Sequence, residues 1–194
     1  MNLKKFFHIL QVEYRAHWFW FVSNYPEGYI GQALRKKYWT SKLKKCGSSP
    51  DFKQRSGIGY PELVEVGDNF SMSTGSLITA AGSKGIYIGN NVGIARGTYI
   101  HASNHRTDGL DTPIIKQGVT SIDIGYKGKK YGVVIEDDVW IGSNVVILSG
   151  TKIGKGSVVA PGAVVSGRFP AFCVIVGNPA QISIKRSQKS NNKE

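Results

Sequence analysis

The stretch that decides the fold runs Ile135-Glu-Asp-Asp-Val-Trp-Ile141-Gly-Ser-Asn-Val-Val-Ile147-Leu-Ser-Gly-Thr-Lys-Ile153-Gly-Lys-Gly-Ser-Val-Val159-Ala-Pro-Gly-Ala-Val-Val165. An aliphatic residue returns at every sixth position without a slip. A period of six matches neither the 3.6-residue α-helix nor the two-residue alternation of a strand. It fits a coil of three short strands joined by tight corners, with one inward aliphatic side chain per strand. Because each coil buries its interior only by stacking on its neighbours, the stretch predicts a triangular-prism solenoid, a mainly β fold.

The same repeat extends toward the N-terminus in two further blocks. A four-residue offset, expected as a small insertion around residues 82–85, separates them. The inward positions of the two blocks are Val66, Met72 and Ile78, then Ile88, Ile94 and Ile100. Many of the 24 glycines fall at expected corners, and Asn90, Asn91 and Asn144 are expected where a corner needs positive φ.

The chain divides into three predicted segments. Residues 1–57 are basic and aromatic-rich, with apolar residues at helical spacing and a turn at 24–28. We expect this helical N-terminal extension to cap the open end of the first coil; the alternative is that it lies on an anionic membrane surface. Residues 58–184 form the β-helix, interrupted by a loop over 106–131 that leaves the prism and is expected to be functional. Residues 185–194 form a polar basic tail.

The formal charge of +12 is concentrated at the ends of the chain. Residues 1–57 carry eleven Lys or Arg against three acidic residues. No RNA- or DNA-binding motif accompanies this charge, so we expect no nucleic-acid partner. The apolar run 18–22 is too short for a signal sequence or a membrane span, which predicts a cytoplasmic protein that could reach the inner face of the membrane. Cys46 and Cys173 are expected to be free thiols.

Five motifs, in order, carry a family resemblance: Ile100-His-Ala-Ser-Asn-His105, Thr112-Pro-Ile-Ile, Gln117-Gly118, Asp138-Val-Trp-Ile-Gly-Ser143 and Val176-Gly-Asn-Pro-Ala180. Over roughly residues 62–183 the chain resembles the hexapeptide-repeat acetyltransferases. It is most similar to the branch of galactoside and maltose acetyltransferases and surface-polysaccharide O-acetyltransferases. The resemblance implies a left-handed parallel β-helix, a homotrimer with active sites between subunits, and acetyl-CoA as co-substrate.

The resemblance also assigns candidate residues around the reaction centre. It implies that His105 is the general base, because a neutral imidazole can take the proton of a hydroxyl nucleophile. His101 is interpreted as an outward-facing repeat residue. Asn104 and Asp108 are candidates to orient the loop, the acceptor or the imidazole, and Trp140 is a candidate to pack on the pantetheine arm or the acceptor.

The donor is expected to follow a track of small residues. By resemblance Ser143 meets the thioester end of CoA, and Pro161, Gly162 and Ser166 follow along the pantetheine. Arg168, Lys185 and Arg186 are candidates to meet the phosphates of CoA; the alternative is a solvated basic tail. The chain departs from the family at Pro161, often alanine, and at Gly167-Arg168, often Lys-Asp. It also lacks the acceptor Asn expected near 73–76.

The acceptor is expected to be a sugar hydroxyl or amino group in capsule, lipopolysaccharide or exopolysaccharide synthesis. The alternatives are an antibiotic acetyltransferase of streptogramin or chloramphenicol type and a catalytically inert scaffold. A serine acetyltransferase is disfavoured because its large helical N-domain is missing. A carbonic anhydrase shares the prism but needs three histidines on zinc, and only His101 and His105 lie outside the N-terminal segment; no metal is expected.

Overall fold

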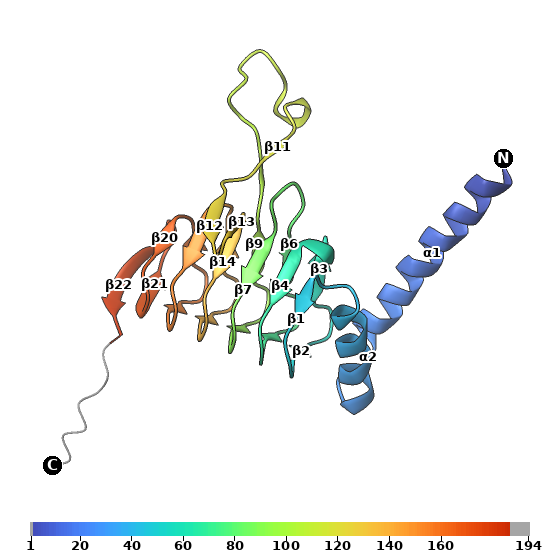
Figure 1. Cartoon of the computed structure of the whole chain (residues 1–194), viewed down its shortest axis with the longest axis horizontal. Coiled ribbons are helices and arrows are strands. Elements are labelled where there is room, and N and C mark those ends of the chain that lie inside the picture. The colour runs from blue at the N-terminus through green and yellow to red at the C-terminus, as the bar shows by residue number, and fades with distance from the viewer. Residues whose placement is uncertain (1, 187–194) are drawn as a thin grey trace.

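A computed structural model describes residues 2–186 and shows a triangular prism with two helices at its N-terminal end (Figure 1). Three sheets of parallel strands form its faces, which we name A, B and C in the order in which the chain visits them. Face A contains β1 (Lys45–Cys46), β4 (Val64–Val66), β7 (Ile86–Ile88), β14 (Val133–Ile135), β17 (Thr151–Ile153) and β20 (Arg168–Phe169). Face B contains β2 (Asp51–Phe52), β5 (Ser71–Met72), β8 (Gly93–Ile94), β15 (Trp140–Ile141), β18 (Val158–Val159), β21 (Cys173–Val176) and the antiparallel β22 (Gln181–Lys185). Face C contains β3 (Gly57–Gly59), β6 (Leu77–Thr79), β9 (Tyr99–His101), β16 (Val146–Ile147) and β19 (Val164–Val165).

The six-residue repeat sets the register in which the strands of successive coils pair. Ile147 pairs with Ile100 on one side and with Val165 on the other, so residues that are equivalent in the repeat are neighbours in space. All twelve aliphatic positions predicted to point inward are at most 2% exposed. The predicted β-helix is therefore confirmed, and with it the short insertion that separates β6 from β7.

The corners use positive φ as expected at two of the three asparagines. Asn91 and Asn144 have φ of 54° and 55°. Asn90 was expected to join them and does not. Its side-chain oxygen instead accepts a hydrogen bond from the backbone N–H of Asp68, and its own N–H donates to the carboxylate of Asp137, both at 2.8 Å. Asn90 thus ties three successive coils together through its side chain and backbone rather than through its φ angle.

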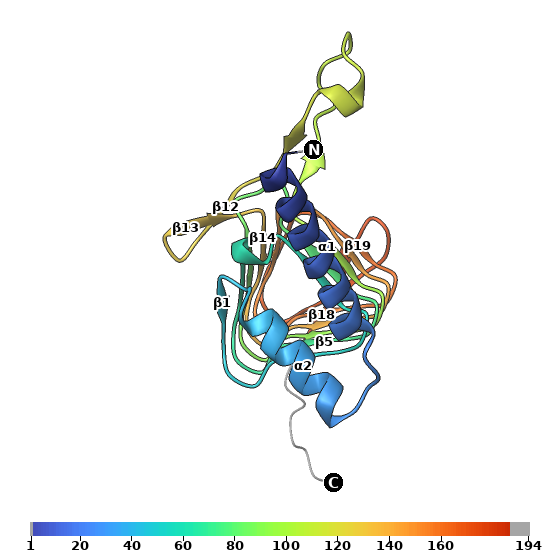
Figure 2. The ribbon, with the colours of Figure 1, turned by 90° about the vertical axis from the view of Figure 1, so that its right-hand side faces the viewer.

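Two helices form the N-terminal extension, α1 (Leu3–Asn24) and α2 (Tyr29–Thr40). Trp39 of α2 is buried at the open end of the prism, with its ring centroid 6.3 Å from that of Phe52 and 5.8 Å from that of Phe19 of α1. α2 lies across this end of the prism (Figure 1 and Figure 2), and its Trp39 covers the open core, as the capping role requires. The N-terminal part of α1 extends away from the solenoid (Figure 1). Neither helix is both long and apolar enough to cross a bilayer.

The solenoid begins earlier than the predicted boundary at residue 57. The helical segment ends at Thr40, and β1 and β2 already pair with the second coil. Cys46, Phe52 and Ile58 continue the six-residue spacing, but a thiol and an aromatic ring stand where the predicted columns have aliphatic residues. These two residues concealed the first coil in the sequence pattern. The structural reason for the aromatic residue is that Phe52 packs against the capping Trp39.

The segment 106–131 is not a single loop, as predicted, but parts of two hairpins. β10 (Asn104–His105) pairs with β11 (Val119–Thr120) around a projecting tip that contains the short helix η2 (Ile114–Lys116). β12 (Ile124–Tyr126) pairs with β13 (Lys129–Tyr131), and this second hairpin packs on face A through a small separate core with Val134. The remaining short helix, η1 (Pro61–Leu63), joins the first two coils.

The second hairpin is held by a buried carboxylate. Glu65 of face A accepts hydrogen bonds from Lys129 and the Tyr131 hydroxyl, both at 3.2 Å, and pairs with Lys44 at 3.1 Å. Burial opposes ionisation of Glu65, but the two lysines outweigh it and lower the pKa of this carboxyl. Burial and the adjacent carboxylate raise the pKa of Tyr131 to about 12, so its hydroxyl remains a donor.

We predict that Arg35→Met destabilises the cap. The side chain of Arg35 is fully buried and donates to the carbonyl oxygens of Phe52 and Tyr25, both at 2.8 Å, and to Glu27 at 2.9 Å. Removing the hydrogen bonds that the buried guanidinium makes should lower the free energy of unfolding by about 3–5 kcal/mol. This corresponds to a decrease of roughly 6–20 °C in Tm, measured by thermal unfolding. Lys37→Met makes the same charge change at an exposed site of α2 and serves as control. Equal Tm values for the two variants would contradict the prediction.

Candidate functional site

His105 projects from the edge between faces C and A, which we call the C–A edge. The chain leaves the prism after β9 and forms β10, whose two residues are both exposed. His105 pairs with Val119 of β11, and the next N–H, of Arg106, donates to the carbonyl of Gly118 at 3.1 Å. The backbone of His105 is therefore fixed by a ladder while its imidazole is open to solvent. This is a suitable presentation for a group that exchanges a proton with a bound substrate.

His101 precedes it at the outward position of β9, as the repeat predicted. It pairs with Thr79 of the preceding coil, and its Nε2 lies 3.4 Å from the Ser103 hydroxyl. Burial lowers the pKa of His101, and the neighbouring His105 lowers it further. His101 is therefore held neutral over more of the acidic range than a free histidine, and it is only half-buried beside the candidate base.

Asp108 does not lie against His105 in this chain. Its carboxylate pairs with Arg106 through two hydrogen bonds, of 2.7 and 3.1 Å, and the guanidinium lowers the pKa of that carboxyl. The projecting tip is held instead by Gln117, whose side chain bonds the backbone N–H of Gly109 at 2.9 Å and two carbonyls of the tip at 2.6 Å. Asn104 is exposed beside His105 in β10, where it can meet an acceptor.

Trp140 lies on the outward side of face B. Its half-exposed indole covers Gly93 of the neighbouring strand, and a Cβ built on Gly93 would come within 2.7 Å of the ring. Any side chain at Gly93 would displace the indole. Gly93 is thus a positioning residue that the sequence pattern did not reveal, because a glycine in a glycine-rich repeat carries no distinctive signal.

Ser143, Pro161 and Gly162 stack along a different edge, between faces B and C, which we call the B–C edge. The N–H of Gly162 donates to the carbonyl of Ser143 at 2.9 Å, so the two corners are in direct contact. A Cβ on Gly142 would lie 2.6 Å from the nitrogen of Pro161, which shows how closely the corners pack. Pro161 and Gly162 are exposed. The three residues lie on two consecutive corners of this edge, and their role in binding the donor stays a prediction.

The other predicted donor contacts do not lie on this track. Ser166 and Arg168 fall at the C–A edge, two coils beyond the point where the chain leaves for His105. Lys185 ends β22, and the guanidinium of Arg186 donates to the carbonyl of Gly156 at the edge between faces A and B. The predicted tail at 185–194 thus begins inside a strand, and its residues 187–194 lie outside the described part of the chain.

The candidate base and the candidate donor track therefore lie on two edges of one prism, with face C between them. Face C presents half-buried or exposed apolar side chains outward, at Leu77, Tyr99, Val146, Leu148 and Val164. Over residues 2–186 no group of three or more His, Cys, Asp or Glu side chains is placed to hold a metal ion. Cys46 and Cys173 are free, and Cys173 is buried in the core.

Comparison with known families matches residues 132–167 to the family described as bacterial transferase hexapeptide (six repeats). Among curated proteins, a 2,3,4,5-tetrahydropyridine-2,6-dicarboxylate N-acetyltransferase of Staphylococcus aureus (strain JH9) is 47% identical over 62 residues. That match covers 32% of this chain and 26% of the relative, so the chain spans about a quarter of the length of the curated relative it matches.

Two solved structures match nearly the whole chain. A maltose O-acetyltransferase from Clostridium difficile 630 superimposes with a TM-score of 0.71 at 25% identity, covering 91% of this chain and 86% of the other. A hexapeptide-repeat-containing acetyltransferase from Vibrio cholerae O1 biovar eltor, complexed with acetyl coenzyme A, superimposes with a TM-score of 0.72 at 23% identity, covering 89% and 85%.

We predict that His101 titrates below the ordinary histidine pKa of 6.5 and that His105→Gln moves its pKa upward. The variant removes the neighbouring positive charge but not the larger effect of burial, so the pKa should stay below 6.5. Because unfolded His101 takes up its proton at higher pH than the folded residue, the resulting stability loss appears only as pH falls below about 6.5. Histidine NMR titration of both proteins measures the shift; an unchanged His101 curve in the variant would refute the coupling.

Proposed function

We propose that this chain, which carries the bacterial transferase hexapeptide repeat and has the fold of the hexapeptide-repeat acetyltransferases, is an acetyl-CoA-dependent acetyltransferase. The observation that carries the proposal is the presentation of His105: a solvent-open imidazole on a backbone fixed by β11, at the base of a projecting hairpin. The maltose O-acetyltransferase fold and the acetyl coenzyme A complex support the donor and a sugar hydroxyl as the acceptor.

His105 acts as the general base in direct transfer. Its neutral imidazole takes the proton of the acceptor hydroxyl as the oxygen attacks the thioester carbonyl. The tetrahedral intermediate then collapses, the C–S bond breaks, and the imidazolium returns the proton to the departing CoA thiolate. The products are an acetyl ester and CoA, with no covalent enzyme intermediate. Holding both substrates in one cleft supplies the remaining acceleration through orientation.

The site is shared between subunits of a homotrimer. A base at the C–A edge and a donor track at the B–C edge can serve one reaction only if the C–A edge of one chain faces the B–C edge of the next. Such a head-to-tail contact closes into a ring in a cyclic oligomer. The outward apolar side chains of face C, which lies between these edges, support this packing because subunit contacts favour apolar surface at their centre.

The acceptor is a glycan of surface-polysaccharide synthesis, met at the membrane. α1 supports this assignment, because its N-terminal part projects from the prism and exposes Phe7, Leu10, Tyr14 and Trp20. Lys4, Lys5 and Arg15 provide the positive charge of the same helix. An amphipathic helix with aromatic and basic residues binds anionic lipid surfaces, where a lipid-linked glycan is found.

We expect His105→Asn to lower kcat by about 10²–10⁴ while leaving acetyl-CoA binding unchanged, because the variant removes only proton transfer. Calorimetric titration should show about one acetyl-CoA per chain in both proteins, and thiol release with a panel of sugars gives turnover. His101→Asn is the matched control and should retain most activity. Absence of acetyl-CoA binding in the wild type would refute the acetyltransferase assignment; full activity in His105→Asn would refute the base.

Mixing two inactive variants tests the shared site. Ser143→Arg blocks the donor track and His105→Asn removes the base, so each homotrimer is inactive. In randomly reassembled mixed trimers, about a quarter of the sites combine an intact histidine with an intact track. Mixing after reversible dissociation should therefore restore about a quarter of wild-type activity per site. Mixed trimers that are verified by two affinity tags and remain inactive would place both groups in one subunit.

A further inference from the structure

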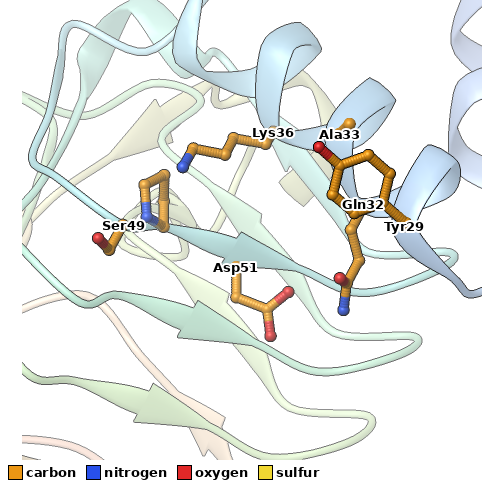
Figure 3. A pocket seen from close by; sticks show the side chains of 7 residues that line it. Tyr29, Gln32, Ala33, Lys36, Ser49 and Asp51 are labelled. Atoms are coloured by element: carbon orange, nitrogen blue, oxygen red, sulfur yellow. The ribbon is translucent and has the colours of Figure 1, made fainter.

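Two adjoining hollows lie between α2 and the first coils, on the N-terminal side of the donor track. The first, of about 520 Å³, is lined by Tyr29, Gln32, Ala33, Lys36, Ser49, Pro50 and Asp51. Figure 3 shows the side chains of α2 facing Ser49 and Asp51 of the first coil. The second, of about 370 Å³, is lined by Glu27, Gly28, Gln32, Lys53, Ser73, Thr74 and Arg96. Each volume is in the range of a small-ligand site.

The two hollows share one lining residue and are linked by an ion pair. Gln32 lines both, and the carboxylate of Asp51 in the first pairs at 2.9 Å with the ammonium of Lys53 in the second. Together they form one groove, which we call the α2 groove. It runs beneath α2 across the start of face B and opens at the B–C edge.

The α2 groove has a net positive charge. Its two acidic side chains are already compensated, Asp51 by Lys53 and Glu27 by the buried Arg35 at 2.9 Å. Arg96 and Lys36 are both exposed, and neither takes part in an ion pair within residues 2–186. Ser73 and Thr74, which carry hydroxyl groups, line the same hollow as Arg96. A free guanidinium next to two hydroxyl donors is suited to a carboxylate or a phosphate.

The groove opens on the same edge as the donor track. The N–H of Gly97 donates to the carbonyl of Thr74 at 3.3 Å, and the N–H of Asn144 donates to that of Arg96 at 2.9 Å. The corners of Thr74, Arg96 and Ser143 are thus consecutive steps, each about 4.8 Å, along one edge. The donor track runs from Ser143 in the opposite direction. A molecule in the groove would therefore approach the thioester position from the side that CoA leaves free.

We propose that the α2 groove is the acceptor site and that it selects an anionic sugar, a sugar acid or a sugar phosphate. Arg96, Ser73 and Thr74 hold the carboxylate or phosphate, and Gln32 and the exposed ring of Tyr29 contact the neutral part of the glycan. The reacting hydroxyl then points along the B–C edge toward Ser143. This inference rests on the proposed acetyltransferase function and names the substrate class of that enzyme.

Binding of three matched probes to the full-length protein tests the groove without turnover. Methyl glucuronoside and methyl glucoside differ only in the carboxylate, and glucose 1-phosphate carries the phosphate. We expect at least one anionic probe to bind more tightly than the neutral one by NMR or calorimetry, and the tighter of the two identifies the anion. Arg96→Gln should weaken that binding about tenfold to a hundredfold, the range for a hydrogen bond to a charged group.

Arg55→Gln is the matched control, because Arg55 is an exposed arginine at the corner of the first coil and does not line the groove. It should leave binding of all three probes unchanged. Equal affinity for charged and neutral probes, equal effects of the two variants, or no binding of any probe at millimolar concentration would overturn the anionic acceptor site. Acetyl-CoA binding, measured alone in each variant, should not change; its absence in the wild type would instead refute the acetyltransferase.

Discussion

The stacking of one inward side chain on its equivalent in the next coil is the interaction on which the structure depends. Ile100, Ile147 and Val165 form one such column, each fully buried and each paired in register with the next. A shift by one residue would turn these side chains to the outside, so the register is strongly specified. Because these columns fill the core, every candidate group must lie on an edge, in a segment that leaves the prism, or at an outward position of a face, as His101 and Trp140 do.

This constraint explains why one chain presents its candidate groups in separate places. Successive corners place their side chains about 4.8 Å apart along one edge, which suits an elongated donor. This spacing does not bring residues of another edge of the same prism any closer. His105 therefore reaches outward on a hairpin, while Ser143 and Gly162 remain on the prism. The hairpin is rigid where it begins, through the pairing of His105 with Val119, and Gln117 braces its projecting tip.

The sequence predicted the elements that follow the six-residue repeat. It did not predict the elements whose inward positions or contacts depart from that repeat. The inward columns, the insertion before β7 and the capping helices followed from spacing alone. The first coil was missed because Cys46 and Phe52 interrupt the aliphatic pattern. The hairpins within 106–131 were missed because their strands, of two or three residues each, are too short to show a period. Asp108 was placed near the base by proximity in sequence, yet its strongest available partner was the adjacent Arg106. The outward position of His101 followed from the repeat, whereas the Ser143 track followed from the family resemblance.

The ion pairs of the structure explain where part of the uneven positive charge of the chain is used. Arg35 forms an ion pair with Glu27 in the cap, and Lys44 and Lys129 form ion pairs with the buried carboxylate of Glu65. The exposed cations outside these pairs include those of α1 and α2, and Arg55 and Arg96 at the first corners of the B–C edge. Low-dielectric walls lined by one sign of charge attract oppositely charged molecules and raise their local concentration. The same end of the prism that caps the core therefore also carries a positive field at the α2 groove, which is the basis of the anionic acceptor proposed for it.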